Sequence, residues 1–211
     1  MKIEGFELGP IGTNAYLISG DPGGEAVLVD APEGAAALVE NWEEQTGGKV
    51  TTLLLTHGHW DHMQDMKRLQ DHGLTTMGHR DDALFFTEPE VMRNFAMPGL
   101  RLEGGTIDRW LEAGESLEVL GETMEVRHVP GHCPGNLVFH FPGQQVAFVG
   151  DAIFRLGVGR YDIPGGSWPV LEQSILNQIY TLPATTMLYP GHGPETQVEY
   201  EKTNNPFVQI S

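Results

Sequence analysis

Apolar residues in the first third of the chain form short runs separated by glycine and proline clusters, a pattern typical of consecutive strands. KVTTLLLT, over residues 49–56, is nearly continuously apolar and predicts a buried strand. PEGAAALVENWEEQTGG, over 32–48, places apolar residues at helical spacing before a glycine pair and predicts a helix with Pro32 in its first turn. The runs KIEGFEL, NAYLIS and EAVLVD predict three further strands over residues 2–8, 14–19 and 25–30.

The remaining pattern predicts two more helices and five more strands. DHMQDMKRLQDHG has apolar residues near helical spacing and predicts a helix over 61–73 that stops at Gly73. After an irregular stretch from Glu88 to Asp108, strand-like runs return as SLEVL, TMEVRHV, NLVFHF and QVAFVGD. WPVLEQSILNQIYTL then predicts a helix, and TTMLYPGHG a last strand. This order is typical of a layered α/β protein with helices outside its sheets.

Composition narrows the class of protein. A chain of 211 residues without repeats, low-complexity tracts or an evident linker predicts a single domain over 1–211. The formal charge of −17 disfavours nucleic acid and anionic membrane surfaces as partners. One cysteine, no signal-peptide pattern in MKIEGFELGP and no long apolar stretch predict a cytoplasmic protein with no membrane partner. We expect a monomer or small homo-oligomer, although none of these features determines the oligomeric state.

The stretch LLLTHGHWDHMQD places three histidines and two aspartates directly behind a predicted buried strand. His57 and His59 are two positions apart and point the same way on a strand end, so they can hold one ion while the following turn aims Asp61 and His62 at a second. Imidazole and carboxylate are ligands that zinc, iron and manganese accept.

Three more candidate ligands follow later strand-like runs, and each stands beside a glycine that lets the backbone approach a metal closely. Loops at strand ends on a rigid scaffold are where chemistry is usually carried. These candidates are His132, Asp151 and His192.

THGHWDH matches the HxHxDH signature of the metallo-β-lactamase fold, and His132, Asp151 and His192 complete its ligand set in order. GDAIFRLGVGRYDIPGGS, YPGHGPET and the terminal EKTNNPF are similar to the small, single-domain glyoxalase II-like hydrolases. The resemblance implies an α/β protein with the αββα sandwich of that fold, in which two mixed β-sheets are flanked by helices.

The resemblance also implies a centre of two divalent metal ions, with zinc favoured over iron and manganese. His57, His59 and His132 would bind the first metal. Asp61, His62 and His192 would bind the second, and Asp151 would bridge the two. A metal-bridging hydroxide would act as the nucleophile, because two cations lower the pKa of a shared water strongly. Asp61 would orient that hydroxide or move a proton, and so carries a catalytic role.

The reaction implied is hydrolysis of a small-molecule thioester resembling S-lactoylglutathione. Typical glyoxalase II enzymes carry a C-terminal helical domain that holds glutathione, and this sequence ends before such a domain. Three alternatives remain open: a persulfide dioxygenase of the same fold with one iron held by His57, His132 and Asp151, a lactonase, β-lactamase or other ester hydrolase, and a metal-binding module without catalysis.

Other polar residues have simpler interpretations. Arg160 either pairs with Asp162, which we favour, or meets a substrate carboxylate. Trp60 either lines the substrate cleft or caps the core. The single cysteine, Cys133, is predicted to pack rather than to react. Four histidines outside the signature are predicted to be structural or exposed: His72, His79, His128 and His140.

Overall fold

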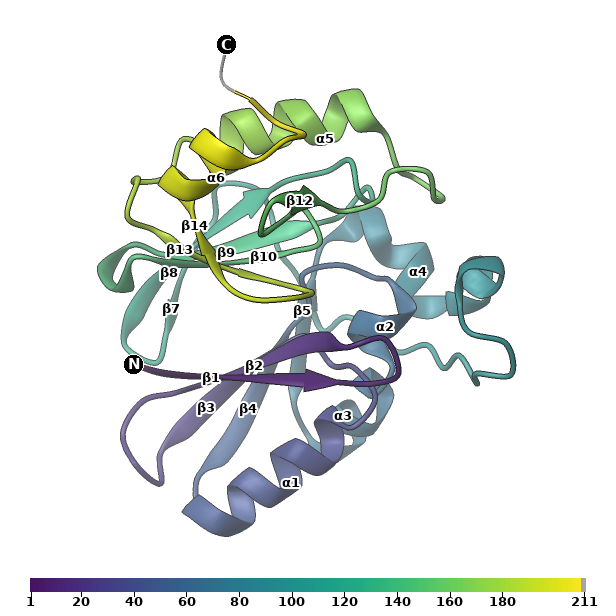
Figure 1. The fold of residues 1–211 in the computed structure, drawn as a ribbon. Helices are drawn as coiled ribbons and strands as arrows, with labels where there is room; N and C mark the ends of the chain where they lie inside the picture. Colours follow the sequence, from purple (N-terminus) through teal and green to yellow (C-terminus); the bar gives the residue numbers. More distant parts are fainter. Residues whose placement is uncertain (210–211) are drawn as a thin grey trace. The chain divides into compact units, whose positions relative to one another are not determined.

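The computed structural model describes residues 1–209, and the chain divides into two compact units, one from Met1 to Trp110 and one from Leu111 onward. Each unit contains a six-stranded mixed sheet with its own helices (Figure 1). The prediction of a single domain stays a prediction. Among the residues described, no helix is long and apolar enough to cross a membrane.

The sheet of the first unit is antiparallel on one side and parallel on the other. Its strands pair in sequence order, antiparallel from β1 to β3 and parallel from β3 to β6. Parallel pairing requires crossover connections, which the helices of this unit supply. The strands are β1 Lys2–Leu8, β2 Thr13–Ser19, β3 Glu25–Val29, β4 Lys49–Leu54, β5 Thr75–Gly78 and β6 Arg109–Trp110.

The first helix begins later than its sequence predicts. α1 spans Ala35–Thr46, so Pro32 precedes it and only accepts a hydrogen bond from Ala35 N–H. A distant residue satisfies the helix start, because Asp65 Oδ2 accepts from the N–H groups of Gly34 and Ala36 at 2.9 and 3.0 Å. A carboxylate at a helix N-terminus satisfies unpaired donors and complements the helix dipole. This tertiary cap sets where α1 begins.

The predicted helix over 61–73 is two helices, α2 at Trp60–Met63 and α3 at Met66–His72. Asp65 separates them, because its N–H donates to Ala31 O and its carboxylate caps α1. The predicted stop is confirmed: Gly73 has a φ of 105° and ends α3. α2, which carries two of the candidate ligands, is held by a hydrogen bond from Ala31 N–H to His62 O at 2.7 Å.

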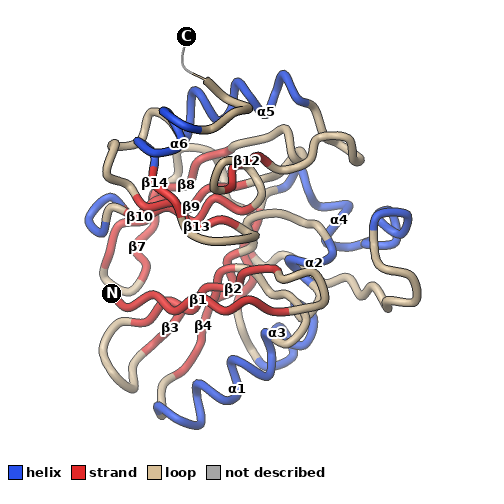
Figure 2. The backbone as a smooth tube through the Cα atoms, in the orientation of Figure 1, coloured by secondary structure: helices blue, strands red, loops and turns tan. Residues whose placement is uncertain are grey.

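The sheet of the second unit has the order β14-β13-β10-β9-β8-β7, and Figure 2 traces its strands in red. Only β10 and β13 pair in parallel, and every other neighbouring pair is antiparallel. The strands are β7 Ser116–Val119, β8 Glu122–His128, β9 Leu137–Phe141, β10 Val146–Gly150, β13 Met187–Pro190 and β14 Thr196–Gln197. Two short strands, β11 Ile153–Phe154 and β12 Gly157–Val158, form a separate hairpin.

Helices cover one face of this second sheet (Figure 1). α5 spans Trp168–Ser174 and continues as a π-helical turn over Ile175–Ile179, so the predicted helix is present but changes its hydrogen bonding halfway. α6 spans Val198–Asn204. Leu171 and Ile175 pack with Val138 and Val149 of the sheet in one buried cluster. Apolar burial of this kind is the main force that holds helices on a sheet.

The elements that sequence reasoning missed are short. Strands β5, β6, β11, β12 and β14 have two to four residues, α4 at Ala83–Thr87 has five, and α6, which was also not predicted, has seven. The chain also makes 3₁₀ turns at Arg80–Asp82, Pro89–Phe95 and Pro142–Gln144. Such short segments carry little periodicity of their own, since pairing with a neighbour decides their conformation.

Candidate metal centre

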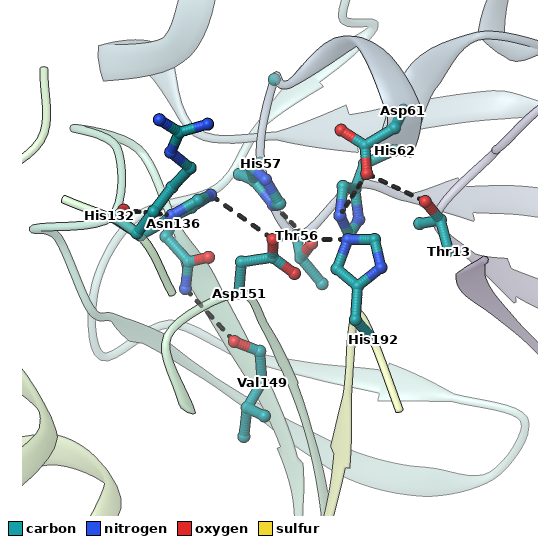
Figure 3. Close-up of polar contacts among 12 residues, drawn as sticks. Thr13, Thr56, His57, Asp61, His62, His132, Asn136, Val149, Asp151 and His192 are labelled. Atoms are coloured by element: carbon teal, nitrogen blue, oxygen red, sulfur yellow. Dashed lines mark hydrogen bonds and ion pairs between the residues drawn. The ribbon is translucent and has the colours of Figure 1, made fainter. Parts of the chain in front are cut away.

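Four candidate ligands converge within the first unit, as Figure 3 shows for three of them. The ring centroids of His57 and His59 are 4.6 Å apart, and those of His57 and His62 are 4.1 Å apart. His62 Nε2 lies 3.2 Å from Asp61 Oδ2. These residues follow β4 and enter α2, so the strand-to-helix transition predicted from the sequence does bring them together.

Asp30 orients two of these histidines and was not singled out from the sequence. It follows β3, the parallel neighbour of β4, so the two strands end at the same edge of the sheet. His62 Nδ1–H donates to Asp30 Oδ2 at 2.8 Å. Thr56 donates its hydroxyl proton to the same oxygen at 2.8 Å, which leaves Thr56 Oγ1 to accept from His57 Nδ1–H at 3.0 Å. Both imidazoles thereby carry their proton on Nδ1 and present Nε2 for coordination.

Close packing explains why a glycine, Gly58, stands between His57 and His59. A Cβ at Gly58 would lie 2.7 Å from Phe85 Cβ, closer than side chains approach. Gly58 N–H donates to the buried carboxylate of Asp82 at 2.9 Å, and the Phe85 ring lies 5.6 Å from the ring of His59. α4 thus packs directly against the loop that carries the histidines.

Asp61 has a fixed carboxylate. Thr13 Oγ1–H donates to Asp61 Oδ2 at 2.9 Å, and both side chains are buried. Thr13 begins β2, and no sequence signal distinguished it from other strand residues.

Three candidate ligands gather within the second unit. β10 and β13 are parallel neighbours, so Asp151 and His192, which follow them, leave the sheet at the same edge. β8 runs in the same direction as β10, because β9 is antiparallel to both, and the loop after β8 carries His132. The Nε2 atoms of His132 and His192 each lie 3.6 Å from Asp151 Oδ2 (Figure 3). One carboxylate oxygen therefore faces two imidazoles.

The orientation of His132 is set by a backbone carbonyl. His132 Nδ1–H donates to Arg160 O at 2.8 Å, so Nε2 is again the nitrogen available for coordination, and it faces Asp151. The Arg160 side chain forms a bidentate pair with Asp162 at 2.9 and 3.0 Å. Hydrogen bonding to Arg160 lowers the pKa of Asp162. The favoured interpretation of Arg160 as an ion-pair partner therefore matches the structure, while its carbonyl has a role that the sequence did not indicate.

Other singled-out residues have ordinary environments. Trp60 is buried at 5% exposure, and Cys133 is buried as well. His72 Nε2–H donates to Glu43 at 2.8 Å, and His140 Nδ1–H donates to Glu125 at 2.9 Å. His128 Nε2–H donates to Pro134 O at 2.7 Å, and His79 accepts from Asp81 N–H at the start of a 3₁₀ turn.

The candidate ligand atoms of the first unit, and those of the second unit, suit a divalent transition metal. In each group imidazole nitrogens and carboxylate oxygens lie 3.2 to 3.6 Å apart, and every one of these side chains is buried except that of His192, which is partly exposed. Ligands about 2.0–2.1 Å from a tetrahedral ion lie about 3.3 Å from one another, so these spacings suit one coordination sphere. Histidines that bind metal usually donate Nδ1–H to a carboxylate or carbonyl oxygen, and these acceptors form the second layer of such sites.

Comparison with known proteins places the chain among metal-dependent proteins. Residues 8–192 match the model of the Metallo-beta-lactamase superfamily. Hydroxyacylglutathione hydrolase GloC of Haemophilus influenzae is 36% identical over 199 residues, which cover 92% of this chain and 87% of that protein.

Two crystal structures resemble the whole chain. BLEG-1 B3 metallo-beta-lactamase matches with a TM-score of 0.90 and 32% identity over 99% of this chain and 100% of that one. TTHA1623 in a di-iron-bound form matches with a TM-score of 0.84 and 33% identity, covering 97% of this chain and 100% of that one. The predicted fold class, mixed α/β with two mixed sheets flanked by helices, is confirmed.

Proposed function

This chain belongs to the metallo-beta-lactamase superfamily as a homologue of a hydroxyacylglutathione hydrolase, and we propose that it is a dinuclear metal-dependent thioester hydrolase. The observation that carries the proposal is the position of Asp151 Oδ2, 3.6 Å from the Nε2 atoms of both His132 and His192. A carboxylate oxygen placed between two imidazole nitrogens would be available as a ligand shared by two cations.

We assign the ligands as the family resemblance implies. His57, His59 and His132 would hold the first metal. Asp61, His62 and His192 would hold the second, and Asp151 would be a ligand of both. Zinc is the proposed native metal, although imidazole and carboxylate donors also accept iron and manganese. When bound, the pair of cations supplies Lewis acidity and a nucleophile at neutral pH.

The residues of the chain prepare this chemistry before any metal binds. Asp30 and Thr56 keep His62 and His57 in the tautomer that presents Nε2. Thr13 fixes the Asp61 carboxylate through Oδ2. A carboxylate held in this way is suited to accept or return a proton during attack on a carbonyl carbon. We therefore retain Asp61 as the residue that moves the proton.

The proposed substrate is a thioester resembling S-lactoylglutathione. Support comes from the related protein of Haemophilus influenzae, which is a hydroxyacylglutathione hydrolase. We further propose that the chain acts as a single domain in the cytoplasm, as a monomer or small homo-oligomer, on a small molecule rather than on nucleic acid or a membrane.

The test is a hydrolysis panel on protein of measured metal content, with S-lactoylglutathione, other acyl thioesters, lactones and β-lactams. We expect S-lactoylglutathione to be the fastest substrate. Asp61→Asn should lower kcat/KM by about 10²-fold or more, because general acid–base groups contribute about 10²–10⁴-fold. Asp71→Asn is the matched control, since Asp71 is exposed and pairs only on the surface with Lys67, and it should retain the wild-type rate.

Two results would contradict the proposal. Background-level rates that are equal in wild type and Asp61→Asn, on every compound of the panel, would argue for a metal-binding protein without catalysis. Rapid oxygen consumption with glutathione persulfide, at one iron per chain, would replace the hydrolase with a dioxygenase.

A further inference from the structure

Glu201 is a fully buried carboxylate that lies outside the ligand group of the second unit. Thr196 Oγ1–H donates to one of its oxygens, at 2.5 Å. Leu156 N–H and Asn205 Nδ2–H both donate to the other oxygen, at 3.0 and 2.8 Å. Burying a charge is costly unless its hydrogen bonds are made, and these three donors meet that requirement. The carboxylate thereby joins α6 to the tip of the β11–β12 hairpin.

Asn205 makes the second link to the same hairpin. The residue is 1% exposed, and its amide Nδ2–H donates to Gly157 O at 3.0 Å as well as to Glu201. Its Oδ1 accepts from Phe207 N–H at 3.0 Å and from Val208 N–H at 3.4 Å. All the hydrogen-bonding groups of this amide are therefore used in tying the C-terminal segment to the hairpin.

Tyr180, which comes directly after the π-helical turn that continues α5, holds the C-terminal segment in place. Its hydroxyl lies 3.1 Å from the carbonyl oxygens of both Glu201 and Val208. Burial, and then the charge of Glu201, raise the pKa of Tyr180 above its usual range, so the hydroxyl stays protonated and remains a donor.

The hairpin needs this support. Leu156, at its tip, has a φ of 58°, in the left-handed region that residues with a Cβ avoid. Strained backbone persists only where surrounding contacts determine it. Leu156 N–H bonds to Glu201, and the carbonyl of the next residue, Gly157, bonds to Asn205. The strained backbone of Leu156 is therefore held by a hydrogen bond on each side.

The hairpin and the residues that follow it, up to Arg160, lie against three candidate ligands. The Phe154 ring meets the His192 ring edge-on, with centroids 5.9 Å apart. A Cβ at Gly159 would fall 1.8 Å from Asp151 O and 2.8 Å from His132 Nδ1, so the backbone of Gly159 packs directly against these two candidate ligands. One residue further, Arg160 O accepts the His132 Nδ1–H bond. Any movement of the hairpin would reach three candidate ligands.

We propose that Glu201 and Asn205 are positioning residues that hold the 153–160 segment against His132, Asp151 and His192, and so set the metal affinity of the site. The inference rests on the proposed function, because it assumes that these three residues bind metal. Glu201 and Asn205 touch neither metal nor substrate in this scheme, and they act through Arg160 O and Phe154.

The experiment measures zinc affinity by competition with a chromophoric chelator, together with the melting temperature of the metal-free protein. Asn205→Ala and Glu201→Gln should each weaken zinc binding by about 10-fold, the lower end of the 10–100-fold cost of losing a direct partner of a ligand, because they act through Arg160 O and Phe154. Asn204→Ala and Glu199→Gln, on the exposed side of the same helix, should bind zinc as the wild type does. A purely structural role would lower the metal-free melting temperature and leave the zinc affinity of the folded protein unchanged.

That last pattern, in Asn205→Ala or Glu201→Gln, would overturn the inference while leaving the proposed function standing. A wild type that binds no zinc, iron or manganese would overturn both. If neither variant folds, hydrogen exchange on the metal-free wild type decides: slow exchange of the Leu156 amide supports the link to Glu201, and exchange as fast as in an exposed loop contradicts it.

Discussion

Asp30 shows how one side chain can determine the chemistry of its neighbours. It accepts hydrogen bonds from His62 Nδ1–H and from the N–H and hydroxyl of Thr56. Its own φ is 62°, a conformation that Asp and Asn tolerate better than other side chains. The residue ends the apolar run EAVLVD much as Asp151 ends VAFVGD, so the sequence held a signal that both carboxylates leave a strand end.

Asp30→Asn tests this role with little change in shape or backbone preference. The amide would place a donor against Thr56 N–H or against His62 Nδ1–H, and one buried donor would lose its partner. We expect zinc affinity to fall about 10–100-fold and the metal-free protein to lose about 1–3 kcal/mol in its free energy of unfolding. Chelator competition and urea unfolding measure the two effects.

Asp21→Asn is the control for that substitution, because Asp21 is exposed in a turn of the same unit. Zinc affinity in Asp30→Asn equal to that of the control would show that Asp30 does not orient a ligand.

Among the elements, α1, β4 and α3 are joined by Glu43. Burial raises the pKa of this carboxyl, but hydrogen bonds from His72, from Val50 N–H and from Lys49 together outweigh it and hold the pKa below the usual value. A carboxyl whose pKa is lowered by folding adds stability above its unfolded pKa, and that stability is lost as pH falls through the folded pKa.

Glu43→Gln should therefore destabilise the protein by about 1–2 kcal/mol at neutral pH, as expected for hydrogen bonds to a charged group. The difference from wild type should shrink as pH falls below about 4.5, toward the lowered pKa. Urea unfolding at neutral pH and at a pH below about 4.5 measures this difference in the free energy of unfolding. Glu44→Gln, on the exposed side of α1, should show a small difference that does not vary with pH. A Glu43→Gln difference that grows in acid would contradict the assignment.

The predicted elements that changed in the structure did so for tertiary reasons. The pattern of residues 61–73 predicts one helix. Asp65 divides it in two, because its N–H donates to Ala31 O and its carboxylate accepts hydrogen bonds at the start of α1. Pro32 precedes α1 because the same carboxylate caps the helix two residues further on. Long-range hydrogen bonds of this kind leave no local pattern.

For the whole molecule, the proposed centre links metal binding to folding. Zinc at 100 times its dissociation constant should stabilise the native state by about 2.7 kcal/mol. For a chain of this length the melting temperature should rise by roughly 5–11 °C, and a chelator should reverse the rise. His57→Ala should lose most of this response. His72→Ala, which removes a histidine outside the candidate groups, should keep it, and absence of a zinc response in the wild type would contradict the proposed centre.

The sequence by itself determined the fold class and the identity of the candidate ligands. Strand runs are recognisable because apolar burial imposes local patterning, and His57, His59, Asp61 and His62 stand together in the chain. Only the tertiary structure decided what surrounds them. The partners Asp30, Thr13 and Arg160 O lie 28 to 48 positions from the residues they orient, and the link from Glu201 to Leu156 spans 45. A hydrogen bond needs its two atoms within about 3 Å, and only the tertiary fold brings residues so distant in the chain that close together.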